Sequence, residues 1–299
     1  MPRVPSTQAL RALESFARLG TVWQAAEELN LTRSAVSHQL RLLERDLGFR
    51  LLDRVGTRVE LTPQGEAYAA DVRRALSMLT GSAARNAGRG ITGALRVSCA
   101  PGFASSWLCP KIGRFCESFP DVHLDLVTPH RLEDVSNPDV DLFIAFGAGE
   151  MPGMRVETLQ EVQFTPMCSP ALMNRMGFAE PDDVLRCVLL HLSDHADWRE
   201  WFRLAGLHDG RARTGVVFSD MNLVYAAALA SQGIAMGDEF ICHDALAKGV
   251  LVRPFGLTIR STRAYQLVRP ADRPETPAAA AFRGWIMQAL RENQAAPDS

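Results

Sequence analysis

Two short helical patterns joined by a tight turn lie near the start of the chain, and they restrict what this region can fold into. Thr21 and Gln24 fit the S/T-x-x-E/Q capping box that begins a helix, and the two alanines that follow allow close approach of another helix. Thr32 can cap the next helix, which ends at Gly48 and places four apolar residues on one face: Val36, Leu40, Leu43 and Leu47. Together with a helical pattern over residues 8–20, this arrangement predicts a helix-turn-helix.

The other side of the second helix carries polar and basic side chains that suit DNA. In a helix-turn-helix this helix enters the major groove, where its first two turns reach base edges and phosphates. The charge is divided accordingly, because residues 1–90 carry 13 arginines and nine acidic residues, whereas residues 91–299 carry 19 basic and 25 acidic ones. A plain helical hairpin with a solvated face is the alternative. The candidate DNA-contacting residues are Arg33, Ser34, Ser37, His38 and Arg41.

Residues 49–61 predict a wing, because two strand-like runs flank a tight turn at residues 55–57. Thr62 and Pro63 then carry the signals that begin a helix, which extends to about Gly88. An apolar stripe follows this helix, and a small domain offers it little surface, so we expect it to pack against a second copy of itself. Packing on its own domain is the alternative. The stripe consists of Tyr68, Val72, Ala75, Leu76, Leu79 and Ala83.

Motifs of this first part carry a specific resemblance: Ala25-Ala26-Glu27-Glu28-Leu29, Leu31-Thr32-Arg33-Ser34-Ala35-Val36-Ser37-His38-Gln39-Leu40, and Leu61-Thr62-Pro63-Gln64-Gly65. The region resembles the winged helix-turn-helix of LysR-type transcriptional regulators. The resemblance implies DNA contacts by Arg54 and Thr62 in addition to those of the recognition helix. It also implies that the long helix is a dimerisation linker, with the dimer contact formed by Tyr68, Val72, Leu76 and Leu79. The family commonly has glutamine at the position of Arg33, so the resemblance does not imply which bases this chain prefers.

The remaining two hundred residues or so alternate between strand and helix patterns, which predicts an α/β domain with mainly parallel sheets. Residues 88–93 are rich in glycine and indicate a hinge. Residues 101–106 predict a turn with capping hydroxyls at a helix N-terminus, where free amides suit an anion or serve ordinary capping. Strands are expected at residues 94–99, 122–127, 140–146, 155–161, 162–168 and 265–268, and a helix at residues 220–229.

Motifs of this second part resemble the effector domain of the same family, in the branch that contains regulators of glycine cleavage and of β-lactamase expression. They include Phe119-Pro120-Asp121-Val122, Asp139-Val140-Asp141-Leu142, Cys168-Ser169-Pro170, Phe218-Ser219-Asp220 and Gly233-Ile234-Ala235-Met236-Gly237. The resemblance implies an N-terminal winged helix-turn-helix with a long linker helix, followed by a two-lobed α/β effector domain similar to periplasmic binding proteins. The implied domains are residues 1–61, 62–92 and 93–299, with lobe I at about 93–162 and 267–299 and lobe II at about 163–266.

The same resemblance implies that a small effector binds in the cleft between the lobes. The branch often has Ile-Arg-Tyr-Gly where residues 144–147 of this chain read Ile-Ala-Phe-Gly, so an arginine that would suit an anionic effector is absent. Phe103, Phe146 and Met221 predict a more apolar pocket for an aromatic or amphipathic metabolite. The implied effector-binding residues are Gly102, Phe103, Ser105, Thr128, Phe146, Met221 and Asn222.

Histidines and cysteines suggest two other functions. His191 and His195 are similar in spacing to an inverted zinc-hydrolase motif, but the glutamate beside the second histidine and a third ligand are missing. Cys109 and Cys116 flank a helix and could serve a thiol-based redox sensor. No G-x-S-x-G or Walker loop occurs, so we expect no enzyme. Three further thiols lie in apolar patterns typical of a core: Cys99, Cys168 and Cys242.

The motifs and the resemblance they carry imply a transcriptional regulator with several partners: a pseudo-palindromic double-stranded operator, a small organic effector, a second copy in a homodimer or homotetramer, and RNA polymerase. No metal or other cofactor is expected. Apolar residues make up 47% and charged residues 22%, as in globular proteins. No apolar stretch reaches the roughly 20 residues of a membrane span, and no secretory signal is visible, so a cytoplasmic protein is expected.

Overall fold

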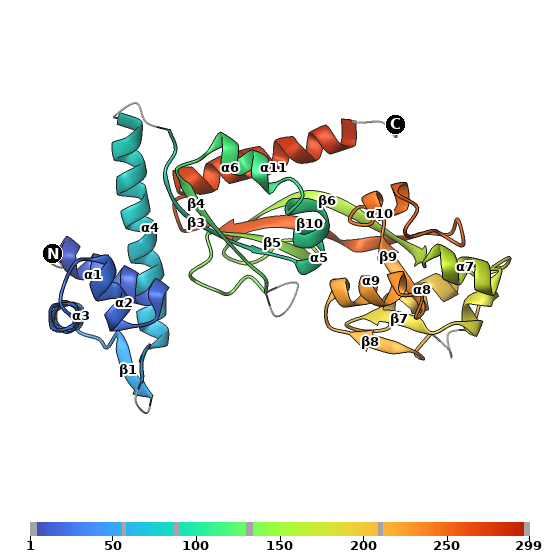
Figure 1. Cartoon of the computed structure of the whole chain (residues 1–299), viewed down its shortest axis with the longest axis horizontal. Helices are drawn as coiled ribbons and strands as arrows, with labels where there is room; N and C mark the ends of the chain where they lie inside the picture. The colour runs from blue at the N-terminus through green and yellow to red at the C-terminus, as the bar shows by residue number, and fades with distance from the viewer. Residues whose placement is uncertain (1–4, 56–57, 87–89, 130–133, 209–211, 296–299) are drawn as a thin grey trace.

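The chain folds into a small helical head and a larger α/β domain, with one long helix between them (Figure 1). The structure is a computed structural model that describes residues 5–55, 58–86, 90–129, 134–208 and 212–295. The predicted hinge at residues 88–93 and the tip of the predicted wing lie partly outside these ranges. Among the described residues, no helix is both long and apolar enough to cross a membrane.

The head contains the predicted helix-turn-helix and wing. The hydroxyls of Thr21 and Thr32 accept hydrogen bonds from the backbone N–H groups three residues on, at 3.3 and 3.1 Å. Only one of the two hydrogen bonds of the capping box forms at Thr21. The Gln24 side chain accepts a hydrogen bond from the Thr21 hydroxyl and not from the Thr21 backbone N–H. Gly20 and Gly48 end their helices with φ of 77°, a conformation that favours glycine. The elements are α1 (Thr7–Leu19), α2 (Val22–Glu28), α3 (Arg33–Leu47), β1 (Leu52–Val55) and β2 (Arg58–Leu61).

The long helix α4 (Pro63–Asn86) packs its apolar stripe largely against its own head. Val72 is 4% exposed and belongs to the core of the head, and the Tyr68 ring lies edge-on to Phe49 with centroids 5.9 Å apart. The head thus already covers Val72, so its expected burial against a second copy is wrong, whereas half-buried Tyr68 keeps part of its surface free and its dimer contact stays a prediction. The physical reason is that α1 packs along α4 and supplies the apolar surface that so small a domain was expected to lack.

The exposed apolar part of α4 lies closer to its C-terminal end. Leu76 is half-buried against the head core, whereas Leu79 is 64% exposed and Met78 is 38% exposed. Ala75 is also exposed, and the side chain of Ala83 lies outside the described part of the chain. Of the predicted dimer residues, Leu79 alone thus offers a largely free apolar side chain.

The α/β domain is built on one curled eight-stranded sheet with the order β4-β3-β5-β10-β6-β9-β7-β8 (Figure 1). Strands within each end are parallel, as predicted, but β10 and β6 are antiparallel to each other and to their neighbours, so the sheet as a whole is mixed. The strands are β3 (Gly93–Cys99), β4 (Val122–Val127), β5 (Leu142–Gly147), β6 (Met154–Met167), β7 (Leu189–Leu192), β8 (Val216–Phe218), β9 (Ile234–Asp238) and β10 (Ile259–Pro270).

The two lobes share the long strands β6 and β10. The sequence predicts two strands over residues 155–168, but β6 is a single strand of 14 residues. Its first half is partly exposed and its last residues are all buried, so the burial pattern changes at the expected boundary while the backbone stays extended. Pairing with β10 maintains that extension, with irregularities between Arg260 and Ala264 and between Tyr265 and Gln266.

Helices cover both lobes, and one apolar core extends through them. In the first lobe, α11 lies beside α6 (Figure 1) and packs Phe282 against Phe115 with ring centroids 5.2 Å apart. In the second lobe, α8 buries Trp198 and Trp201. The helices are α5 (Pro101–Phe103), the π-helical turn η1 (Ala104–Leu108), α6 (Ile112–Ser118), α7 (Pro170–Met176), the 3-10 helix η2 (Pro181–Arg186), α8 (Ala196–Leu204), α9 (Met221–Leu229), α10 (His243–Ala247) and α11 (Pro277–Ala295).

Candidate DNA-binding face and effector cleft

Helix α3 presents the predicted DNA-contacting side chains on the face opposite its buried residues. Arg33, Ser34, His38 and Arg41 are exposed, and Ser37 is half-buried. The helix is anchored from behind by Val36, Leu40 and Leu43, which belong to the core of the head. The cap at Thr32 fixes the first turn of α3. The exposed side chains therefore all project from one face of a well-defined helix.

The two predicted phosphate contacts outside α3 lie in different surroundings. Arg54 is exposed on β1, opposite Val59 of β2. Thr62 is half-buried, and its hydroxyl donates to the Arg50 carbonyl at 2.9 Å and accepts from the Gly65 N–H at 2.9 Å. The Thr62 hydroxyl therefore caps α4, and its proton is already used inside the protein.

A groove of about 680 Å³ extends the basic face beyond the predicted residues. Arg45 and Arg50 line it together with His38 and Arg41. Arg45 lies four residues after Arg41, and helical spacing alone already places it on this face. Arg50 follows the helix in the turn toward the wing, and only the tertiary structure brings it alongside.

The effector residues predicted at the start of each lobe's helix come together across the cleft. Ser105 Oγ donates to Asn222 Oδ1 at 2.6 Å, which joins η1 of lobe I to α9 of lobe II. A Cβ on Gly102 would lie 2.9 Å from Ile241 Cδ1 and 3.3 Å from Met221 Cβ, so the backbone of lobe I touches the side chains of lobe II. The lobes are closed on this side of the cleft.

The turn before η1 differs from its expected form. Ala100 occupies the cap position of α5 without a side-chain hydrogen bond, and Pro101 is the first helical residue. Ser105 and Ser106 lie inside the π-helical turn, so the expected capping hydroxyls at a helix N-terminus are wrong. Thr128, the remaining predicted position in lobe I, is exposed after the edge strand β4 and makes no side-chain hydrogen bond within the described residues.

Aromatic side chains fill the centre of the cleft. The Phe103 ring is fully buried, with centroids 4.9 Å from Tyr265, 5.0 Å from Trp107 and 5.9 Å from Phe240. The Phe146 ring lies 5.1 Å from the same Tyr265. Sequence reasoning missed Tyr265, Trp107 and Phe240 as cleft residues. Helical spacing from Phe103 could have placed Trp107, but Tyr265 and Phe240 come from separate elements that no spacing relates. We call these five aromatic residues the cleft cluster.

A buried carboxylate lies against the cleft cluster. Asp238 is 1% exposed and accepts hydrogen bonds from the Tyr265 hydroxyl at 2.9 Å and from the Phe240 N–H at 2.9 Å. Burial raises the pKa of Asp238 to about 6, because the ionised form loses its hydration, although these hydrogen bonds act in the opposite direction. Burial also raises the pKa of Tyr265 well above its ordinary value.

The three thiols that were predicted to lie in the core do lie there. Cys99, Cys168 and Cys242 are buried, and burial raises the pKa of Cys168 to about 11 and that of Cys242 to about 12, so both stay protonated at neutral pH. Cys109 and Cys116 are exposed, but they do not flank a helix as predicted, because Cys109 precedes α6 and Cys116 lies within it. They are the two thiols on which the redox-sensor alternative depends.

The histidine pair of the hydrolase alternative is engaged within lobe II. His191 Nε2 lies 2.7 Å from the Thr214 carbonyl, to which it donates, and the His191 and His195 ring centroids are 4.4 Å apart. Burial lowers the pKa of His191. Within the described part of the chain, no three histidine, cysteine or acidic side chains are placed to hold a metal ion.

A head with an open recognition helix and wing, joined to two α/β lobes that close on a cleft, defines a ligand-responsive DNA-binding regulator. Comparisons with known proteins agree. Residues 7–66 match the family model "Bacterial regulatory helix-turn-helix protein, lysR family", and residues 88–291 match the model "LysR substrate binding domain". The chain belongs to the LysR family of bacterial transcriptional regulators, and its second domain is an effector-binding domain.

Relatives and solved structures extend over nearly all of the chain. It is 35% identical to the glycine cleavage system transcriptional activator of Escherichia coli K12, over 95% of this chain and 94% of that protein. It is 32% identical to the transcriptional activator AmpR of Pseudomonas aeruginosa, over 96% of each. The effector domain of that AmpR covers 67% of this chain and 96% of its own, at 29% identity and a TM-score of 0.60. ArgP of Mycobacterium tuberculosis, at 19% identity, shares the fold, with a TM-score of 0.69 over 96% of this chain and 98% of the ArgP chain.

Proposed function

We propose that the protein binds a pseudo-palindromic double-stranded operator in the cytoplasm, as a homodimer or a dimer of dimers. Helix α3 enters the major groove with Arg33, Ser37 and His38 toward the base edges, while Arg54 of the wing lies along the flanking phosphates. The proposal depends above all on one observation: α3 exposes its polar face while its apolar face is buried in the head. Relatives named as transcriptional activators support activation through RNA polymerase.

Sequence-selective enrichment of DNA by the full-length protein, at two salt concentrations, tests this proposal. Phosphate attraction weakens steeply as salt rises, whereas base readout persists, so the two contributions separate. We expect a partly symmetric motif whose half-sites are about one helical turn apart. Failure to enrich any motif, with all binding lost at the higher salt, would contradict the proposal.

Replacing Arg54 and Arg33 with alanine should have different effects on DNA binding. Arg54→Ala is expected to weaken binding to every sequence alike and to reduce the salt slope by about one, because one phosphate contact is lost. Arg33→Ala is expected to relax the preference at one base pair by about tenfold or more, since a base contact contributes roughly 1–3 kcal/mol of discrimination. Titrations of operator and random DNA by fluorescence anisotropy measure both effects.

The matched control is Arg203→Ala, which removes the same charge from an exposed arginine on α8 of the second lobe. It should leave both the operator affinity and the salt slope unchanged. If Arg33→Ala and Arg54→Ala act identically on operator and random DNA, the placement of α3 in the groove is wrong.

We further propose that the effector is a small aromatic or amphipathic molecule bound at the cleft cluster, and that the protein needs no metal or other cofactor. The buried rings of Phe103 and Tyr265 and the half-buried ring of Phe146 favour an apolar group. Trp107 Nε1 is buried without a hydrogen-bond partner in the described residues, so an acceptor on the effector would satisfy it. Since Phe103 is fully covered in the closed form, entry requires the Ser105–Asn222 contact to open.

A panel of aromatic acids, amino acids and polar dianions tests the effector class by isothermal titration. We expect aromatic acids to bind, and Asn222→Ala to change their affinity because it releases the contact that closes the lobes. Leu223→Ala provides the control, because it alters an exposed neighbour on the same helix. Exclusive binding of polar dianions would refute the apolar pocket.

A further inference from the structure

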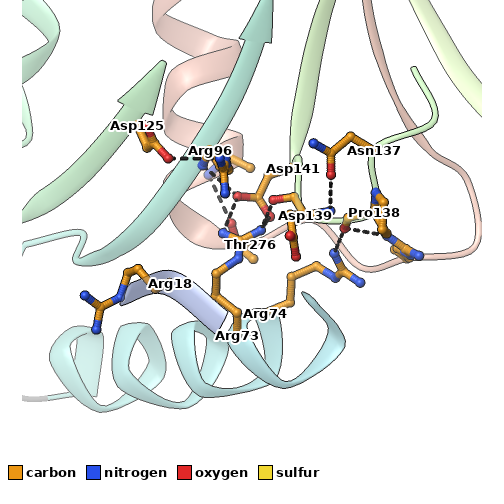
Figure 2. Close-up of polar contacts among 12 residues, drawn as sticks. Arg18, Arg73, Arg74, Arg96, Asp125, Asn137, Pro138, Asp139, Asp141 and Thr276 are labelled. Atoms are coloured by element: carbon orange, nitrogen blue, oxygen red, sulfur yellow. Dashed lines mark hydrogen bonds and ion pairs between the residues drawn. The ribbon is translucent and has the colours of Figure 1, made fainter. Parts of the chain in front are cut away.

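Two consecutive arginines of α4 hold a loop of the first lobe (Figure 2). Arg73 donates to both carboxylate oxygens of Asp141, at 2.9 and 3.1 Å, and also to the Asp139 carbonyl. Arg74 donates to the Pro138 carbonyl at 2.7 Å. The helix that carries the DNA-binding head is thus tied to residues 137–141, the segment that leads into β5.

The Arg73–Asp141 pair is shielded from solvent, unlike most ion pairs on this protein. The side chains of Arg73 and Asp141 are 15% and 4% exposed, whereas those of the surface pair Arg260 and Glu161 are 75% and 70% exposed. A two-pronged guanidinium–carboxylate contact is strong and directional, and removing one partner leaves an uncompensated buried charge. The orientation of α4 on the lobe is therefore specified by this pair.

The loop is connected to the framework of the first lobe. The Asp141 carboxylate also accepts the backbone N–H of Arg96 on β3 at 2.8 Å, and the Asp141 N–H donates to the Arg96 carbonyl at 2.9 Å. Arg273, which precedes α11, donates to the Pro138 carbonyl at 3.3 Å. The loop leads into β5, β5 pairs directly with β10, and β10 continues into the second lobe. These strands connect the cleft between the lobes to the loop that Arg73 and Arg74 of α4 contact.

Beyond this loop, α4 also contacts β3 and α11, and a partly polar cavity occupies the remaining space between head and lobe. A cavity of about 290 Å³ separates α1 and α4 from β3 and β4, and charged side chains from both domains line it: Glu14, Arg18, Arg73, Arg96, Asp125 and Asp139. An interface of this kind lacks the continuous apolar area that would hold two domains together permanently. The orientation of the head on the first lobe therefore depends on a small number of polar contacts. A different orientation could replace them with other polar contacts.

We propose that Arg73 and Asp141 form a conformational latch that holds the head in one orientation on the first lobe and thereby sets the spacing between operator half-sites. The inference rests on the proposed operator binding. Effector binding in the cleft acts on the latch only to the extent that the effector prefers one lobe arrangement. With the latch intact, head and first lobe move as one body, and with it broken, α4 can take other orientations on the first lobe.

Operator variants in which the distance between half-sites changes by one base pair at a time test the latch. The full-length protein should prefer one spacing by at least tenfold. Arg73→Gln and Asp141→Asn should each reduce that preference by about tenfold, and the double variant should add little, since both changes remove the same contact. Arg73→Lys keeps the charge but loses the two-pronged geometry, and an intermediate preference is expected. The controls Arg203→Gln and Glu200→Gln, an exposed pair on α8, should have no effect.

Small-angle X-ray scattering without DNA gives a second readout that does not depend on operator binding. The distance distribution should broaden in Arg73→Gln and Asp141→Asn but not in the controls. Thermal unfolding verifies that each variant is folded. If Asp141→Asn does not fold, Arg73→Gln alone tests the latch. Scattering curves identical to the parent protein, or an unchanged spacing preference, would overturn the latch. If no operator motif is recovered while the scattering still changes, the operator proposal fails and the latch stands.

Discussion

Replacing Gly65 with alanine is expected to unfold the DNA-binding head while the effector domain stays folded. Gly65 is buried in the first turn of α4, where an added Cβ would lie 2.1 Å from the Leu51 carbonyl oxygen. That oxygen already accepts the Thr62 N–H at 2.9 Å, and the Leu51 side chain is fully buried. The clash is with backbone, so no change of rotamer relieves it, and overpacking of this kind costs about 3 kcal/mol.

Differential scanning calorimetry of the full chain measures this effect, because domains with separate cores unfold in separate transitions. The head transition should move to lower temperature or disappear, and operator binding should be lost with it. Gly284→Ala is the matched control, since an added Cβ on this exposed residue of α11 meets nothing within 4 Å. It should raise stability slightly, because alanine is the better helix former. A head transition unchanged in Gly65→Ala would show that α4 does not pack on the wing segment as described.

The second large effect concerns Asp238, whose buried carboxyl should make the effector domain less stable as pH rises from about 4 to about 6. Its pKa is about 6 in the folded protein, against an ordinary value of 3.8 in the unfolded chain. Between these values the folded form keeps a proton that the unfolded form has lost, so the free energy of unfolding falls with rising pH and levels off above 6. This difference between the folded and unfolded pKa of Asp238 corresponds to a change of about 3 kcal/mol in the free energy of unfolding.

Chemical unfolding of the parent protein and of Asp238→Asn across pH 4 to 8 isolates this contribution. The difference in unfolding free energy between the two should change by about 3 kcal/mol through the window and stay constant above it. Tyr265→Phe should move the fall to higher pH, because the Tyr265 hydroxyl donates to the ionised carboxylate and favours that form. A difference that is flat with pH would mean that Asp238 is not desolvated in the folded state.

Local sequence signals were enough to predict the helix-turn-helix and its limits. Capping threonines, terminal glycines and the spacing of apolar residues act within a few residues of one another, so they specify α1, α2 and α3 without knowledge of distant contacts. The same local logic places the exposed face of α3 and the strands of the wing. Motif resemblance added the two-lobed domain, and it identified the residues that meet across the cleft at Ser105 and Asn222.

Features whose partners are far apart in the chain could not be predicted in this way, because they depend on packing. Periodicity shows that α4 has an apolar stripe but not what covers it, and α1 covers much of it. Pairing with β10 turns two expected strands into the single strand β6. The cleft cluster, the desolvation of Asp238 and the contact of Arg73 with Asp141, 68 positions apart, exist only once separate elements are packed together. Burial and direct contact are properties of the packed chain, and local sequence patterns do not contain them.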